Sequence, residues 1–153
     1  MSIVPCPLPV SVAFKFRLEA SLGIAQQRMD AAQVVLSQEM RVLQEIQREL
    51  DIEKDALKRA LEGQGKDALQ NPRRLSGWNL HIDAQKDKLN SIAERLSFQG
   101  SVVEECREAL KECRVMVEKF KRLKEKKWKE FVTEDLKKEQ ASLDEIGQRS
   151  GRE

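Results

Sequence analysis

The chain has 153 residues, enough for one domain, and its 28 basic and 26 acidic residues leave a formal net charge of only +2. Aromatic residues make up 5% of the sequence and charged residues 35%, so few large side chains are available to fill a thick core. The balanced charge excludes a chain that is basic throughout, and any nucleic-acid site must therefore be local. This composition favours long helices over a compact globule.

Residues 1–13 are apolar but begin without a charged region, and Pro5, Pro7 and Pro9 interrupt them. They make a poor signal peptide and are too short to span a bilayer, so we expect a flexible lead-in. The three cysteines show no repeated short spacing, which fits a reducing compartment, and Cys6 supports no interpretation. We therefore expect a soluble, cytoplasmic protein.

Residues 14–62 carry a sustained heptad, which predicts a coiled-coil helix. One series of apolar residues falls seven apart: Leu22, Met29, Leu36, Leu43, Leu50, Leu57. The interleaved series is Leu18, Ala25, Ala32, Glu39, Ile46, Glu53, Ala60. Residues 63–77 hold the helix breakers Gly63, Gly65, Asn71-Pro72 and Gly77, and we expect a turn there.

A second heptad predicts a helix over residues 78–147, followed by a flexible tail over residues 148–153. Its two series are Ile82, Leu89, Leu96, Val103, Leu110, Val117 and Trp78, Gln85, Ile92, Gln99, Cys106, Cys113, Phe120. If the chain folds back between the two helices, residues whose numbers sum to 138 or 139 face one another. The predicted fold is therefore all-α, a long antiparallel two-helix coiled-coil hairpin over residues 14–147.

Two polar interruptions of the heptads support this pairing. Glu39 falls opposite Gln99, and Glu53 falls opposite Gln85, so that in each pair an amide can donate a hydrogen bond to a carboxylate. A parallel, in-register homodimer would instead place identical glutamates against each other, which is costly. The polar positions therefore favour the hairpin.

The residues give little support for catalysis. His81 is the one histidine and stands beside the expected turn, where it is typical of a surface or capping residue. Cys106 and Cys113 lie about 10 Å apart along a helix, too far for a disulfide or a one-turn metal site. The stretch "EGQGKDALQ" has no preceding strand and no GKS or GKT, so it is not a phosphate loop. We expect no enzyme activity, no cofactor and no metal.

The segment "KFKRLKEKKWKEF", Lys119–Phe131, is strongly basic and leaves several interpretations open. It could bind nucleic acid, lie on a membrane surface, form a solvated helix face or dock another protein. In the predicted pairing the first helix begins near Phe14, which faces Lys124. Residues of the second helix after Lys124 therefore have no facing residue in the first helix. The apolar residues among them are Trp128, Phe131, Leu136, Leu143, Ile146. This favours protein docking. A nucleic-acid-binding or structural tethering coiled coil remains the alternative.

Three stretches resemble the flagellar export protein FliJ and its injectisome counterpart YscO. They are "FKFRLEASLGIAQQRMDAAQVVL", "GWNLHIDAQKDKLNSI" and "LKEKKWKEFVTEDLKKEQASLDEIGQ". The resemblance covers nearly the whole chain, and the proline-rich lead-in before Phe14 departs from it. It implies a stalk-like coiled coil that binds and stimulates the hexameric export ATPase, and that links the ATPase to the export-gate membrane protein and to substrate chaperones. It also implies peripheral association with the inner face of the cell membrane through the export apparatus.

The resemblance also implies two functional surfaces. The ATPase-ring-facing residues would be Phe14, Phe16, Arg17, Lys121, Arg122, Lys124, Lys126, Lys127, Trp128, Phe131. The gate-facing residues, near the turn, would be Trp78, His81, Ile82, Gln85. Trp78 and Ile82 are also heptad residues, and their place in the heptads favours packing over a gate-facing role.

Overall fold

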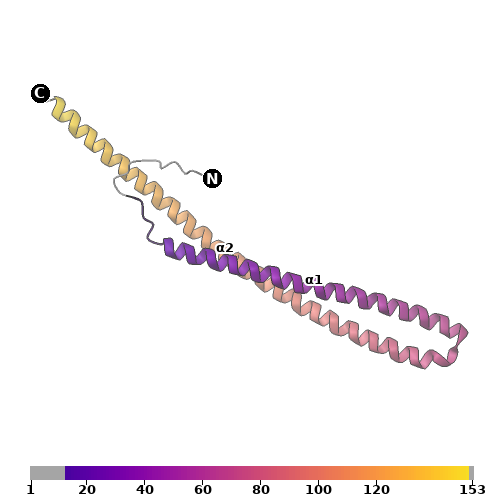
Figure 1. Ribbon diagram of the computed structural model, residues 1–153. Helices are drawn as coiled ribbons and strands as arrows, with labels where there is room; N and C mark the ends of the chain where they lie inside the picture. Colours follow the sequence, from indigo (N-terminus) through magenta and orange to yellow (C-terminus); the bar gives the residue numbers. More distant parts are fainter. Residues whose placement is uncertain (1–12, 152–153) are drawn as a thin grey trace. The chain divides into compact units, whose positions relative to one another are not determined.

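The computed structural model describes residues 13–151, which form two long helices joined by a short connection. Helix α1 spans Glu19–Gln70, a 3₁₀ helix η1 spans Pro72–Arg74, and helix α2 spans Leu75–Gly151 (Figure 1). No strand occurs within the described residues. The fold is therefore the all-α helical hairpin that the two heptads predict. The first twelve residues of the expected lead-in, with Cys6, lie outside the described part of the chain.

The connection between the helices is shorter than the sequence predicts. Helix α1 continues through Gly63 and Gly65, and α2 already includes Gly77, so only residues 71–74 separate them. Proline lacks an N–H group and disfavours helical geometry in the residue before it, and Asn71 accordingly has φ −138° and ψ 74°. Of the expected breakers, the Asn71-Pro72 pair alone ends a helix.

The outer helix ends also differ from the prediction. Helix α1 begins at Glu19 and not at Phe14, and the acidic side chain in its first turn suits the positive end of the helix dipole. Residues 13–18 are not helical. Helix α2 continues past residue 147 to Gly151, into the stretch for which the sequence suggests a flexible tail.

The contacts divide the chain into two units. Unit 2 is Arg28–Cys113 and contains the turn. Unit 1 contains the chain up to Gln27 together with the chain from Arg114 onward. Each unit is described by itself below.

In unit 2 the apolar heptad residues of α1 and α2 form one narrow seam. Its most buried cluster is Ile46, Leu50 and Ile92, with Leu89 and Leu96 packed against it, and Ile92 is only 2% exposed. This cluster contains both residues of the predicted pairs Ile46–Ile92 and Leu50–Leu89. Burying one such side chain fully contributes about 1.5–3 kcal/mol. The predicted antiparallel register is thus present in unit 2.

Two polar layers interrupt the seam of unit 2, as the sequence predicts. Gln99 donates from Nε2 to the Glu39 backbone oxygen at 3.0 Å and to its carboxylate. Gln85 donates from Nε2 to the Glu53 backbone oxygen at 3.2 Å and also to its carboxylate. Because each amide donates both to a backbone carbonyl and to a carboxylate of the opposite helix, these layers help to fix the register.

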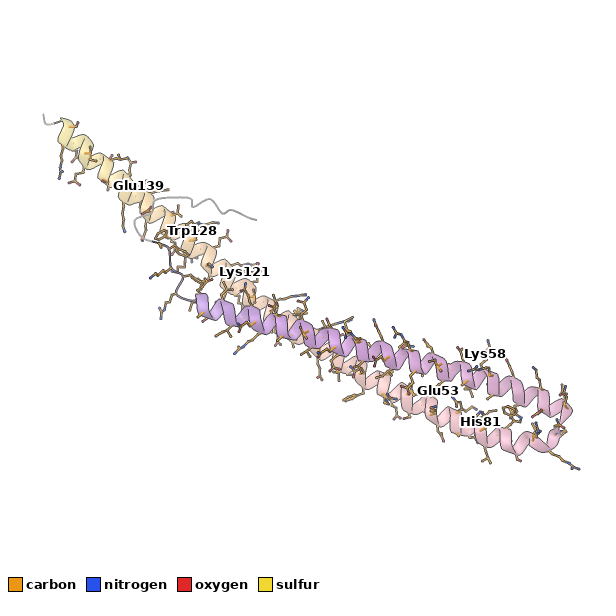
Figure 2. The ribbon with its side chains drawn as sticks, viewed as in Figure 1. Glu53, Lys58, His81, Lys121, Trp128 and Glu139 are labelled. Carbon is orange, nitrogen blue, oxygen red and sulfur yellow. The ribbon has the colours of Figure 1, made fainter. Side chains whose placement is uncertain are left out.

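The Glu53 layer carries a third member. Lys88 Nζ lies 2.8 Å from Glu53 Oε1, and Figure 2 labels Glu53 on the helix that faces it. Hydrogen bonds from Lys88 and then from Gln85 lower the pKa of the Glu53 carboxyl below its ordinary value of 4.5, against a smaller opposing effect of desolvation. The glutamate therefore stays ionised within the seam.

Candidate functional site

Unit 1 contains an aromatic cluster that joins the non-helical residues 13–18 to α2. The Phe14 ring meets the Trp128 ring edge-on at 5.2 Å and lies 5.5 Å from the Phe131 ring. Trp128 and Phe131 stack on each other at 5.9 Å. Trp128 keeps 41% of its surface exposed, so the cluster is packed on one side and open to a partner on the other.

The position of Phe14 corrects the pairing that the sequence suggests. A helical Phe14 would face Lys124 and leave Trp128 and Phe131 without a partner in the chain. In extended chain each residue advances about 3.3 Å, against 1.5 Å in a helix. Residues 17 and 18 form a turn and residues 13–16 have no regular structure, so this stretch does not follow the helical rise of α2. The phenylalanine therefore reaches Trp128, and the prediction of unpartnered aromatics is wrong for these two.

A groove of about 890 Å³ runs beside this cluster. Its walls are residues 13–18 on one side and Leu123, Lys127, Glu130, Phe131 and Glu134 of α2 on the other. Phe16 and Leu18 are half-buried along it, whereas Arg17 points to solvent. The groove thus combines an apolar floor with charges of both signs.

Some basic residues around the aromatic cluster form ion pairs with glutamates, and others are exposed to solvent. Lys124 Nζ lies 2.8 Å from Glu19 Oε2, an ion pair that ties α2 to the first turn of α1 within unit 1. Arg122 and Lys127 pair along α2 with Glu118 and Glu130 at 3.9 and 3.4 Å. Lys121 and Lys126 are exposed, and Figure 2 labels Lys121 and Trp128 on this helix. Of the predicted ring-facing residues, the structure therefore brings Phe14, Trp128 and Phe131 together and leaves these two lysines on the surface.

Beyond the cluster, α2 continues as an exposed helix. Leu136, Leu143 and Ile146 keep 60%, 62% and 59% of their surface exposed. Figure 2 labels Glu139, which lies in the same stretch and is also exposed. These three apolar residues remain candidates for contact with another protein, as the sequence predicts.

The predicted gate-facing residues lie in unit 2, and most of them are engaged. Trp78 donates from Nε1 to Asp67 Oδ2 at 2.6 Å, and a Cβ atom at Gly63 would lie 2.5 Å from the Trp78 ring. Gly63 is therefore a packing residue that lets the indole lie against α1, not a helix breaker. Ile82 is 4% exposed and belongs to the seam, and the Gln85 amide binds Glu53.

Among the four predicted gate-facing residues, His81 alone is exposed; its ring lies 6.0 Å from the Trp78 ring. Two leucines near the turn were missed: Leu69 is 89% exposed and Leu80 is 73% exposed. The signal that could have found them is their position outside both heptad series. Leucines close to the turn that do not belong to the seam have no partner within a two-helix hairpin.

The described residues contain neither a cluster of metal-ligating side chains nor a helix apolar enough to cross a bilayer. No three groups from His, Cys, Asp and Glu within residues 13–151 lie close enough to hold a metal ion. Every helix in that part of the chain is too polar for a membrane span. Cys106 and Cys113 are half-buried free thiols of the seam series.

The fold and these surfaces define a helical-hairpin coiled coil with an aromatic cluster set in a basic stretch. A family model described as "Flagellar FliJ protein" matches residues 14–153, and the chain belongs to this family. Its fold is also similar to that of a solved structure described as a putative YscO homolog, CT670, from Chlamydia trachomatis. The TM-score is 0.78 at 20% identity, over 89% of this chain and 94% of that one. No curated protein matches the sequence. The chain is thus a component of type III protein export, in a family of non-enzymatic export proteins.

Proposed function

We propose that this chain is the stalk-like coiled coil that binds and stimulates the hexameric export ATPase, and that it has no enzymatic activity of its own. The observation that carries the proposal is the aromatic cluster of unit 1, set in a basic stretch, in a chain of the FliJ family. That family's description supports a flagellar system. The protein would work in the cytoplasm, held at the inner face of the membrane through the export apparatus.

The chemistry of the cluster suits a contact with a protein ring. Phe14, Trp128 and Phe131 form a preassembled aromatic anchor, and partly exposed aromatic side chains are typical of interface hot spots. The lysines around it are exposed, and each exposed ion pair contributes only about 0–1 kcal/mol. Weak pairs around one anchor allow exchange between equivalent sites on a hexamer.

The test is ATPase stimulation by a triple variant, Lys121→Glu, Lys126→Glu and Lys127→Glu, added to the purified export ATPase. We expect stimulation to fall several-fold because the positive rim of the anchor is lost. Lys124 is left unchanged, since a glutamate there would face Glu19 and disturb unit 1 itself.

The matched control is Lys54→Glu, Lys58→Glu and Lys86→Glu, three exposed lysines of unit 2 that change the net charge by the same amount. This control should stimulate like the unmodified chain. Equal stimulation by both triple variants, with both still helical by circular dichroism, would rule out the proposed ring-facing surface.

We further propose that the turn end of unit 2 faces the export-gate membrane protein, through exposed residues. His81, Leu69 and Leu80 provide that surface, whereas Ile82 and Gln85 support it from within the seam. Replacing both leucines by serine should weaken binding to the gate's cytoplasmic part without lowering the melting temperature. Unchanged binding would remove the leucines from the interface. Substrate chaperones are further proposed partners, on the basis of the family alone.

A further inference from the structure

One flank of the unit 2 seam changes from charged to apolar. Near the middle of unit 2, Arg95 Nη1 lies 3.3 Å from Glu49 Oε1, an ion pair between α2 and α1 beside the seam. Moving one heptad away from the turn on both helices places Val42 opposite Val102, because this step preserves the antiparallel register. A second step places Val35 opposite Ala109. The flank positions that hold an ion pair in the middle of unit 2 therefore hold small apolar residues further from the turn.

Three of these flank residues are exposed to solvent, and Val102 is half-buried. Val35 and Val42 keep 45% and 39% of their surface, and Phe98 keeps 71%. Phe98 precedes Val102 by four residues, so the two side chains are neighbours on the same face of α2. Positions beside the seam of a two-helix coiled coil are usually charged. We call Val35, Val42, Phe98 and Val102 the apolar flank.

Four exposed positions on the outer side of the apolar flank carry acidic or neutral side chains. Residues three positions further along a helix lie next to the flank on its outer side. After Val35 and Val42 these are Gln38 and Glu45, and after Val102 and Ala109 they are Glu105 and Glu112, all exposed. The charged residues at these outer positions are therefore all acidic. Two copies of this chain joined through the flank would bring like charges together, which disfavours self-association.

We propose that the apolar flank is a docking surface for one amphipathic α-helix of a partner protein, with an apolar stripe bordered by lysine or arginine. The two-helix seam would become a three-helix packing at this place, since a helix laid against the flank covers the valines and Phe98 together. Its basic residues would meet Glu45 and Glu105. This inference goes beyond the proposed function and rests on unit 2 alone.

The probe is a synthetic, fluorescently labelled peptide of three heptads, with leucine at its two core positions and lysine beside them. Its binding to the full chain is measured by fluorescence anisotropy. The critical variant is Val42→Glu with Val102→Arg, which repeats the Glu49–Arg95 pair one heptad further on and leaves the net charge unchanged. We expect binding to this variant to be about tenfold weaker or worse, because the apolar contact is lost.

Leu61→Ser is the matched control, since Leu61 is 46% exposed in the same unit but lies outside the apolar flank. It should bind the peptide like the unmodified chain. Phe98→Ser is a second test at an exposed position, and it should weaken binding several-fold even if the double variant folds poorly. A peptide with glutamate in place of lysine should also bind about tenfold more weakly.

Three outcomes would overturn the proposal. The first is equal affinity of the lysine peptide for the unmodified chain and for both flank variants. The second is equal affinity of the lysine and glutamate peptides. The third is a concentration-dependent dimer, seen by light scattering, that the flank variants abolish, because the occupant would then be a second copy of this chain.

Discussion

Unit 2 pairs helix with helix, whereas part of unit 1 pairs a helix with non-helical chain. In unit 2 both partners advance at the same rise per residue, so the predicted pairs Ile46–Ile92 and Glu53–Gln85 are found together. In unit 1 residues 13–18 are not helical and do not share the rise of α2, and Phe14 consequently meets Trp128 and not Lys124. Counting heptads predicts contacts only where both partners are helical.

A seam residue of unit 2 also differs from the apolar residues that lie beyond the aromatic cluster of unit 1. The seam of unit 2 buries Ile92 almost completely, while Leu136, Leu143 and Ile146 of unit 1 remain open to solvent. Burial of Ile92 contributes to the free energy of unfolding. The three exposed side chains contribute little to it and are available for contacts. The predictions below test this contrast, beginning with the largest effect.

The largest expected difference is between two isoleucines of α2. Ile92→Ala should lower the free energy of unfolding by about 2–5 kcal/mol, because it leaves a cavity beside Ile46 and Leu50. Ile146→Ala, at a residue 59% exposed, should change it by no more than about 0.5 kcal/mol. Urea unfolding followed by circular dichroism measures both. Similar losses from the two variants would contradict the contrast between the units.

A pair of glycines in α1 tests the packing of Trp78 near the turn. Gly63→Ala should destabilise unit 2 by about 1–3 kcal/mol, since the new methyl group would overlap the Trp78 ring and displace it from Asp67. Gly65→Ala would meet open space and should stabilise the helix by up to about 1 kcal/mol.

Melting temperatures of the two glycine variants give the comparison directly. Tryptophan fluorescence adds a second readout, because Gly63→Ala should also shift the Trp78 emission. Two stabilising substitutions would show that the indole has room to move, and that Gly63 is a helix residue like Gly65.

The smallest expected effect is the pH dependence of the Glu53 layer. Because the folded chain holds the pKa of Glu53 below 4.5, unfolding takes up a proton at acid pH. The stabilisation from Glu53 is fully present above pH 4.5, and it is lost as the pH falls below 4.5 and through the lowered pKa. Glu53→Gln should therefore lose less stability on acidification than the unmodified chain. Thermal melts over this range measure the difference, and parallel curves for the two proteins would exclude the effect.

Much of the hairpin could be predicted from particular residues. The leucine and isoleucine series define the seam because their period matches the helix, and Glu39 and Glu53 select the partners Gln99 and Gln85 by hydrogen bonding. The predicted turn is longer than the observed one. Gly63 was counted as a helix breaker, but it lies within α1, and its missing side chain leaves room for the Trp78 ring. The candidate docking cluster was only half predicted: its aromatic residues were identified, but their partner Phe14 was placed beside Lys124.

The sequence by itself determined that the chain is an antiparallel helical hairpin and which side chains face its seam, because periodicity is a local property that every heptad repeats. The tertiary structure alone decided where the chain leaves the helix before Glu19, which residues enclose the aromatic cluster, and which leucines near the turn stay exposed. Those features depend on irregular backbone and on the packing of individual aromatic rings against α1 or α2. Neither of these repeats along the chain, so the heptad pattern does not predict them.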